Sequence, residues 1–244
     1  MPPLGLDRYM ELLRSDGGAL LEAARSALDR QVPACPEWTA RELVVHMGGV
    51  HRFWGDIASR RLVDPSEARP DPPPDDEAGI VSWYREGLER LVAVLGGADP
   101  HEPVWSWSPR KEIGFIQRRM PQETAVHRWD AQDAAGDPEP IDGELAVDGV
   151  DEWLEVFGGA QDRRPEGAGE TIHLHRTDGE GEWLVRVQPD GIDVTRGHEK
   201  GDAALRGSSS DLLLVLWRRL PLDRVEVLGD PSVAERFLGW QDLD

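Results

Sequence analysis

At 244 residues, the chain is long enough to bury a sizeable core as one large domain or two small ones. Hydrophobic residues make up 39% and charged residues 30%, a balance typical of globular proteins rather than of disordered chains. The net charge of −20 disfavours binding to nucleic acids and to anionic membranes, which both attract clustered Lys and Arg.

A single cysteine, Cys35, excludes an intrachain disulfide and suits a reducing cytoplasm, which is the expected location. No apolar run reaches the roughly 20 residues of a membrane span, and the N-terminus lacks the apolar core of a signal peptide. We therefore expect small-molecule partners, with no nucleic acid and no membrane, and a monomer or homodimer.

The first part of the chain has four stretches with apolar residues at helical spacing. They cover about residues 7–29, 39–57, 76–95 and 113–135. Gly17 and Gly18 fall inside the first stretch, so two shorter helices are an alternative there. Pro121 falls inside the fourth and predicts a kink or a restart. Four helices with these faces are enough for a bundle.

The connections between these helices have distinct compositions. Pro33 and Pro36 break the chain in a short loop after the first helix, and residues 64–76 form a linker rich in Pro and acid. Trp105 and Trp107 alternate in the loop before the fourth helix. Alternating tryptophans more often pack a loop onto a core than contact a ligand.

The pattern changes after residue 140 to helices mixed with short alternating strands. Helices are predicted at 143–157, 210–219 and 232–238, and strands at 171–176, 183–188, 192–195 and 225–228. Asp178-Gly179 and Asp190-Gly191 supply hairpin turns. The sequence thus predicts an α+β protein with a helical bundle over residues 1–140 and a small α+β domain over 141–244.

Two histidines lie on the second predicted helix, which starts at a capping box formed by Thr39 and Glu42. His46 projects about 60° to one side of the apolar stripe that contains Leu43, and His51 about 80° to the other, nearer its edge. A histidine on a core face is often a hydrogen-bonded core residue, so that reading stands beside a role in metal binding.

On the fourth predicted helix, Glu123 and His127 are four residues apart and share one face. A carboxylate and an imidazole so placed can bind one divalent ion, with His46 as the candidate third ligand. Asp130, three residues further on, could orient a ligand. The alternative is that Glu123 is a solvated surface residue and His127 fills the core.

Other candidates for a site are weaker. His173 and His175 share a face of a predicted strand and could bind a metal, but an exposed hairpin face explains them better. Cys35 could be a nucleophile, although no base is placed beside it and a small inert side chain is the better interpretation. The arginine pairs 118–119 and 218–219 read as solvated helix positions, though an arginine near a zinc could bind a carboxylate substrate.

Four segments carry a family resemblance: VPACPEWTARELVVHMGGVHRFW at 32–54, RRMPQETAVHRWD at 118–130, GSSSDLLLVLWRRLP at 207–221 and VEVLGD at 225–230. In combination they resemble the mycothiol-dependent maleylpyruvate isomerase family. The resemblance implies a DinB-like four-helix bundle followed by a sterol-carrier-like α+β domain. Pro121 is not an expected feature of that family.

The resemblance also implies a zinc ion held by His46, Glu123 and His127, which are the same three residues that the spacing selects. It implies in addition a catalytic arginine in the C-terminal domain. Arg219 is the candidate for that role, with Arg218 and Arg224 as rivals.

The function expected from these residues is a zinc-dependent enzyme that uses mycothiol as a thiol cosubstrate. The thiolate would add to a small electrophile, either as a maleylpyruvate-type cis–trans isomerase or as a thiol S-transferase. Two alternatives remain: a non-catalytic module that binds a small ligand or a partner, and a zinc hydrolase that needs no thiol.

Overall fold

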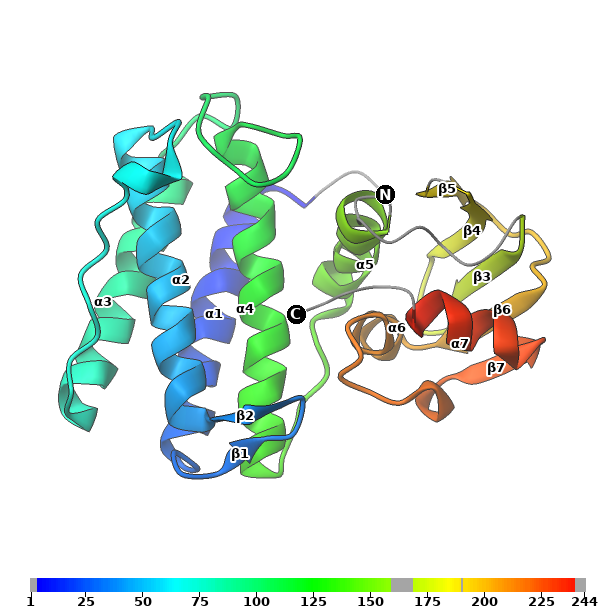
Figure 1. Cartoon of the computed structure of the whole chain (residues 1–244), viewed down its shortest axis with the longest axis horizontal. Helices are drawn as coiled ribbons and strands as arrows, with labels where there is room; N and C mark the ends of the chain where they lie inside the picture. Colours follow the sequence, from blue (N-terminus) through cyan, green and yellow to red (C-terminus); the bar gives the residue numbers. More distant parts are fainter. Residues whose placement is uncertain (1–3, 159–168, 190, 240–244) are drawn as a thin grey trace. The chain divides into compact units, whose positions relative to one another are not determined.

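The computed structural model describes residues 4–158, 169–189 and 191–239. The chain divides into two compact units, one over Leu4–Glu139 and one that begins at Pro140. The first is helical, and the second combines helices with a sheet, as Figure 1 shows. The predicted α+β class, with a helical bundle followed by an α+β domain, is confirmed.

The N-terminal unit is a bundle of four long helices that lie side by side in Figure 1. These are α1 (Leu6–Arg25), α2 (Ala40–Arg60), α3 (Glu77–Gly96) and α4 (Ile113–Ala135). The apolar faces predicted from helical spacing meet in the core, where Leu13, Leu43, Leu91 and Ile116 are all completely buried. Each helix thereby buries the stripe that would otherwise be exposed to water.

Local signals in the sequence account for most helix boundaries. The predicted capping box is present, with Thr39 and Glu42 each bonding the other's backbone N–H at the start of α2. Gly136, at φ 92°, ends α4 in the left-handed conformation that glycine adopts without strain. Helix α1 runs unbroken through Gly17, and α4 runs unbroken through Pro121, so a break at Gly17 and a restart at Pro121 are both wrong.

The segment between α1 and α2 is a small hairpin rather than the predicted loop. Strand β1 (Gln31–Val32) pairs antiparallel with β2 (Cys35–Thr39) at one end of the bundle. Pro36 is tolerated because each strand of a two-stranded hairpin is an edge strand, with one side free of ladder hydrogen bonds. The hairpin leads directly into the cap of α2.

A glycine at the α2–α3 contact sets how closely these helices approach. A Cβ added at Gly48 would overlap the indole ring of Trp83, whereas a Cβ at the neighbouring Gly49 would meet nothing within 4 Å. The Trp83 ring is buried, its Nε1 donates to the Asp71 carbonyl (3.1 Å), and the Arg52 guanidinium lies 5.0 Å from its centre. The indole therefore has little freedom to move away.

We predict that Gly48→Ala lowers the free energy of unfolding by about 2 kcal/mol, because the core would be overpacked. The matched control Gly49→Ala should leave stability unchanged or raise it by up to about 1 kcal/mol, because alanine is the better helix former. Chemical denaturation of both variants tests this. Equal stabilities for the two variants would show that α2 and α3 separate easily.

The C-terminal unit contains helices packed on a five-stranded sheet of order β5-β4-β3-β6-β7. Its elements are α5 (Gly143–Glu152), β3 (Thr171–Arg176), β4 (Glu182–Gln188), β5 (Gly191–Arg196), β6 (Ala203–Gly207), α6 (Ser209–Leu216), β7 (Glu226–Gly229) and α7 (Pro231–Gly239). Neighbouring strands are antiparallel except β3 and β6, which are parallel. The turn predicted at 190–191 lies partly outside the described residues.

Two features of this unit depart from the sequence prediction. Strand β6, which joins the two halves of the sheet, was not predicted. The helix predicted to end near residue 157 changes after Glu152 into a π-helical segment, Trp153–Phe157. In the described part of the chain, no helix is both long enough and apolar enough to cross a membrane.

Candidate metal centre

Two helices of the bundle bring three potential metal ligands together. His46 comes from α2, and Glu123 and His127 come from α4; we call these three residues the bundle cluster. One ligand atom from each lies within 4.8 Å of the other two, and the imidazole ring centres of His46 and His127 are 5.4 Å apart. The structure thus assembles the three residues selected from the sequence, while their role as ligands stays a prediction.

The α-helix itself arranges the two ligands on α4. Glu123 and His127 are one turn apart, with Oε1 of Glu123 3.4 Å from Nε2 of His127. On its other side, Nδ1 of His127 donates to Oδ2 of the fully buried Asp130 at 2.9 Å. This bond leaves Nε2 to face Glu123 and His46, which is the orientation that metal-binding histidines use.

Arg119 also belongs to this site, and its predicted solvated position is wrong. It lies one turn before Glu123 on α4, forms an ion pair with that carboxylate, and is only 5% exposed. The i, i+4 spacing of Arg119 and Glu123 was the available signal. Burial alone would raise the pKa of Glu123, but Arg119 and the hydrogen bond with His127 together hold it well below its usual range. Glu123 is therefore a carboxylate at neutral pH.

The two histidines of the bundle cluster have different electrostatic surroundings. Burial would lower the pKa of His127, but its bonds with Asp130 and Glu123 raise it to about 9. Burial lowers the pKa of His46, and the nearby His127 lowers it further despite the opposing effect of Glu123. At neutral pH, His46 is thus neutral while His127 carries a proton that an incoming metal would displace.

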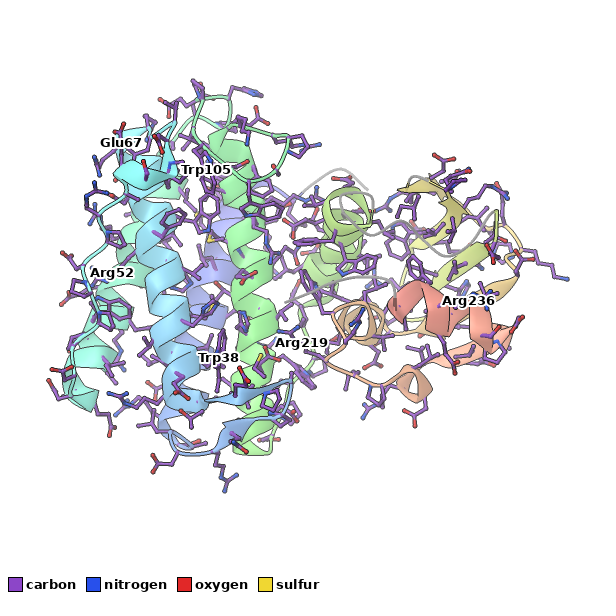
Figure 2. The ribbon with its side chains drawn as sticks, in the orientation of Figure 1. Trp38, Arg52, Glu67, Trp105, Arg219 and Arg236 are labelled. Carbon is purple, nitrogen blue, oxygen red and sulfur yellow. The ribbon has the colours of Figure 1, made fainter. Side chains whose placement is uncertain are left out.

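His51 lies apart from the bundle cluster and is a buried structural residue. Its side chain is completely buried, although its position near the edge of the apolar stripe suggested partial exposure. Its Nε2 lies 3.0 Å from the Thr124 hydroxyl. His46 instead lies half-buried against Trp38, with ring centres 4.6 Å apart. Figure 2 shows Trp38 where the hairpin meets the bundle. His51 is thus the hydrogen-bonded core histidine, while metal binding by His46 stays a prediction.

The chemistry of the donor set fits a divalent transition metal. Two imidazole nitrogens and one carboxylate oxygen are the ligands of many catalytic zinc sites, which keep a further position for water or substrate. The Nδ1 bond from His127 to Asp130 supplies the supporting contact that such sites need. The bundle cluster could therefore hold a divalent metal ion.

Comparison with known families accounts for both units of the chain. The profile described as the mycothiol maleylpyruvate isomerase N-terminal domain matches residues 10–132, and the profile of the C-terminal domain of the same family matches residues 144–236. The chain belongs to this family.

Two solved structures have the same fold over nearly the whole chain. A structure of the mycothiol-dependent maleylpyruvate isomerase is 15% identical, with a TM-score of 0.61, over 93% of this chain and 95% of that one. A histidine-to-alanine mutant of that isomerase gives 12% identity and a TM-score of 0.62 over the same shares. At these identities the likeness establishes the fold. No curated protein matches the sequence.

The arginines proposed for catalysis follow α6 in the C-terminal unit of this family member. Arg219 is half-buried, and its Nη1 donates to the Trp217 carbonyl at 3.0 Å. Arg218 has φ 55° and donates through Nε and Nη2 to the Leu238 carbonyl, and Arg224 is exposed. Arg218 and Arg219 both donate to backbone carbonyls, so these contacts do not separate the two, and Arg219 as the catalytic arginine stays a prediction. Cys35 is half-buried on β2.

The contact between His127 and Asp130 gives a testable prediction. We predict that, above pH 9, where His127 is deprotonated with or without Asp130, Asp130→Asn weakens zinc binding at the bundle cluster about 10- to 100-fold, because the imidazole would lose the carboxylate that orients it and strengthens it as a ligand. Asp133→Asn, on the next turn of α4, is the matched control and should keep the wild-type affinity. Competition with a chromophoric chelator measures both, and equal affinities would show that Asp130 does not support the metal.

Proposed function

We propose that the chain is a metal-dependent enzyme that uses mycothiol as thiol cosubstrate on small electrophiles, as a maleylpyruvate-type isomerase or a thiol S-transferase. The observation that carries the proposal is the bundle cluster, a two-histidine, one-carboxylate site in a chain of this family. Zn²⁺ is the favoured ion for such a set. The expected place of action is a reducing cytoplasm, which suits both a thiol cosubstrate and the single Cys35.

Each residue around the cluster has a defined task in this proposal. His46, Glu123 and His127 would hold the ion, and Asp130 fixes the His127 ring through Nδ1. Arg119 keeps Glu123 ionised. A bound divalent ion would hold the sulfur of mycothiol as the thiolate near neutral pH, because a coordinating thiol loses its proton to the ion's charge. Arg219 is the proposed catalytic arginine for an acidic substrate.

The isomerase and the S-transferase differ in the fate of the thiol. An isomerase returns free mycothiol after a cis-alkene diacid has become its trans isomer. An S-transferase releases mycothiol joined to the substrate through a thioether. Incubation of the loaded enzyme with mycothiol and either a cis-alkene diacid or an alkylating electrophile distinguishes the two by product analysis.

The visible spectrum of the cobalt-substituted protein tests the proposal directly. We expect an intense thiolate-to-cobalt charge-transfer band when mycothiol is added to the wild-type protein. His127→Ala should abolish the band, whereas the matched control His101→Ala, a substitution of an exposed histidine, should keep it. Cobalt binding at the bundle cluster without a band would overturn the thiol mechanism and favour a hydrolase, which uses the same donor set with bound water. Absence of cobalt from this cluster would favour a non-catalytic binding module.

A further inference from the structure

A second group of potential ligands lies on the sheet of the C-terminal unit. It contains three histidines and one glutamate, which we call the sheet cluster: His173, His175, Glu182 and His198. The bundle cluster belongs to the other compact unit and shares no residue with it. The family relationship assigns no role to these four residues.

Strand register and one glycine turn explain how the sheet cluster is assembled. His173 and His175 alternate along β3 and therefore point to the same face, and Glu182 on β4 is the direct cross-strand partner of His175. His198 follows β5, beyond Gly197, whose N–H bonds the Glu182 carbonyl. Gly197 has φ 141°, a conformation that other residues rarely adopt, and it brings His198 over the Glu182 side chain.

The side chains of the sheet cluster converge on the Glu182 carboxylate. Nδ1 of His175 lies 3.0 Å from Oε1, and Nδ1 of His198 lies 2.8 Å from Oε2. The ring of His173 is 5.6 Å from that of His175 and 5.2 Å from that of His198, centre to centre. One ligand atom from each of the four residues lies within 4.8 Å of all the others.

His173 provides an independent indication of a ligand. It is only 5% exposed, although the sequence favoured an exposed hairpin face, and its Nε2 has no hydrogen-bond partner among the described residues. Nε2 lies 3.3 Å from Oε2 of Glu182, but the bond geometry is not that of a hydrogen bond. A buried polar atom without a hydrogen-bond partner is unfavourable, and a metal ion at this position would satisfy it.

We propose that the sheet cluster is a second metal site, which binds one Zn²⁺ through three imidazole nitrogens and one carboxylate oxygen. Imidazole-rich sets select transition metals, whereas Mg²⁺ and Ca²⁺ prefer oxygen ligands. Ligands about 2.0 Å from a tetrahedral zinc are about 3.3 Å apart. The ligand atoms of the sheet cluster lie within 4.8 Å of one another, so the side chains would have to move inward by at most about 1 Å.

Four protein ligands make a closed site, which is the pattern of structural rather than catalytic zinc. The ion would join β3 and β4 to the segment after β5, the strand at one edge of the sheet. His198 is the ligand supplied by that segment, and its side chain is 77% exposed. The site would therefore order an edge of the sheet that otherwise depends on β4 alone.

Zinc titration of the untagged 244-residue chain tests the proposal. In His127→Ala, which disables the bundle cluster, we expect one equivalent of Zn²⁺ with a dissociation constant below about 1 µM. Adding His198→Ala should weaken this binding by at least about tenfold, because one of four ligands is lost. Adding His101→Ala instead is the matched control and should change nothing. Because the His198 side chain is highly exposed, its removal should leave the fold intact.

Amide hydrogen exchange supplies a second readout in the same variants. Zinc should slow exchange in residues 196–200 of the His127→Ala protein and not after His198→Ala has been added. The proposal would be overturned if His127→Ala bound no zinc, or bound it with a dissociation constant above about 1 µM. Equal zinc affinities for the His198→Ala and His101→Ala proteins would also overturn it.

Discussion

Replacement of His46 by alanine is expected to weaken zinc binding at the bundle cluster by about 100-fold or more, while His51→Ala leaves that binding intact. Both histidines lie on α2, five positions apart, but only His46 contributes to the bundle cluster. Loss of a direct ligand should cost at least as much affinity as loss of the contacts that support ligands, which is about 10- to 100-fold. His46 is half-buried, so its removal should change stability little.

His51→Ala should instead lower the stability of the protein and leave zinc binding at the bundle cluster unchanged. The side chain is completely buried, its Nε2 lies 3.0 Å from the Thr124 hydroxyl, and its ring centre is 5.4 Å from that of Tyr84. Alanine would leave a cavity and an unpaired hydroxyl, which together cost about 3 kcal/mol. If His51→Ala does not fold, His51→Gln keeps most of the volume and can still bond Thr124.

Chelator competition and chemical denaturation on the same preparations measure both effects. His175→Ala and His198→Ala are included in every protein, so that only zinc at the bundle cluster is counted. Equal losses of zinc affinity in the His46 and His51 variants would contradict the assignment of ligands, since they would show that general damage to α2 is responsible.

Most of the bundle could be predicted because its signals are local. The capping box at Thr39, the left-handed Gly136 and the apolar stripes each act within a few residues along one helix. The proximity of Glu123 and His127 could also be predicted locally, because residues one helical turn apart lie on the same face. The complete burial of His51 could not, because it involves a contact with Thr124 on another helix.

Elements that depend on distant partners were missed or misplaced. Strand β6 has the sequence Ala-Ala-Leu-Arg-Gly, which lacks β-branched residues, and it is extended because β3 and β7 pair with it on both sides. His198 reaches the sheet cluster through the backbone conformation of Gly197 and the β4–β5 register, neither of which leaves a pattern in the sequence. Contacts between distant parts of the chain therefore determine both strand β6 and the second group of potential ligands.

The affinity of the bundle cluster for zinc is expected to rise about tenfold per pH unit up to pH 9 and then to level off. The cause is His127, whose pKa is raised to about 9 by Asp130 and Glu123 against the effect of burial. Below that pH the imidazolium must lose a proton before Nε2 can bind the ion. The pKa values of His46 and Glu123 are lowered, so both already have their metal-binding forms at neutral pH.

Two measurements test this dependence with the sheet cluster disabled by His175→Ala and His198→Ala. Titration calorimetry in buffers of different ionisation enthalpy should show about one proton released per zinc bound at pH 7. In chelator-buffered zinc, the change of slope should lie near pH 9 for this protein and at lower pH once Asp130→Asn has been added, because the main bond that raises the His127 pKa is then weakened. An affinity that does not change between pH 7 and 9 would mean that His127 is neutral before the metal arrives. The carboxylates of Asp130 and Glu123 would then orient the His127 ring without raising its pKa.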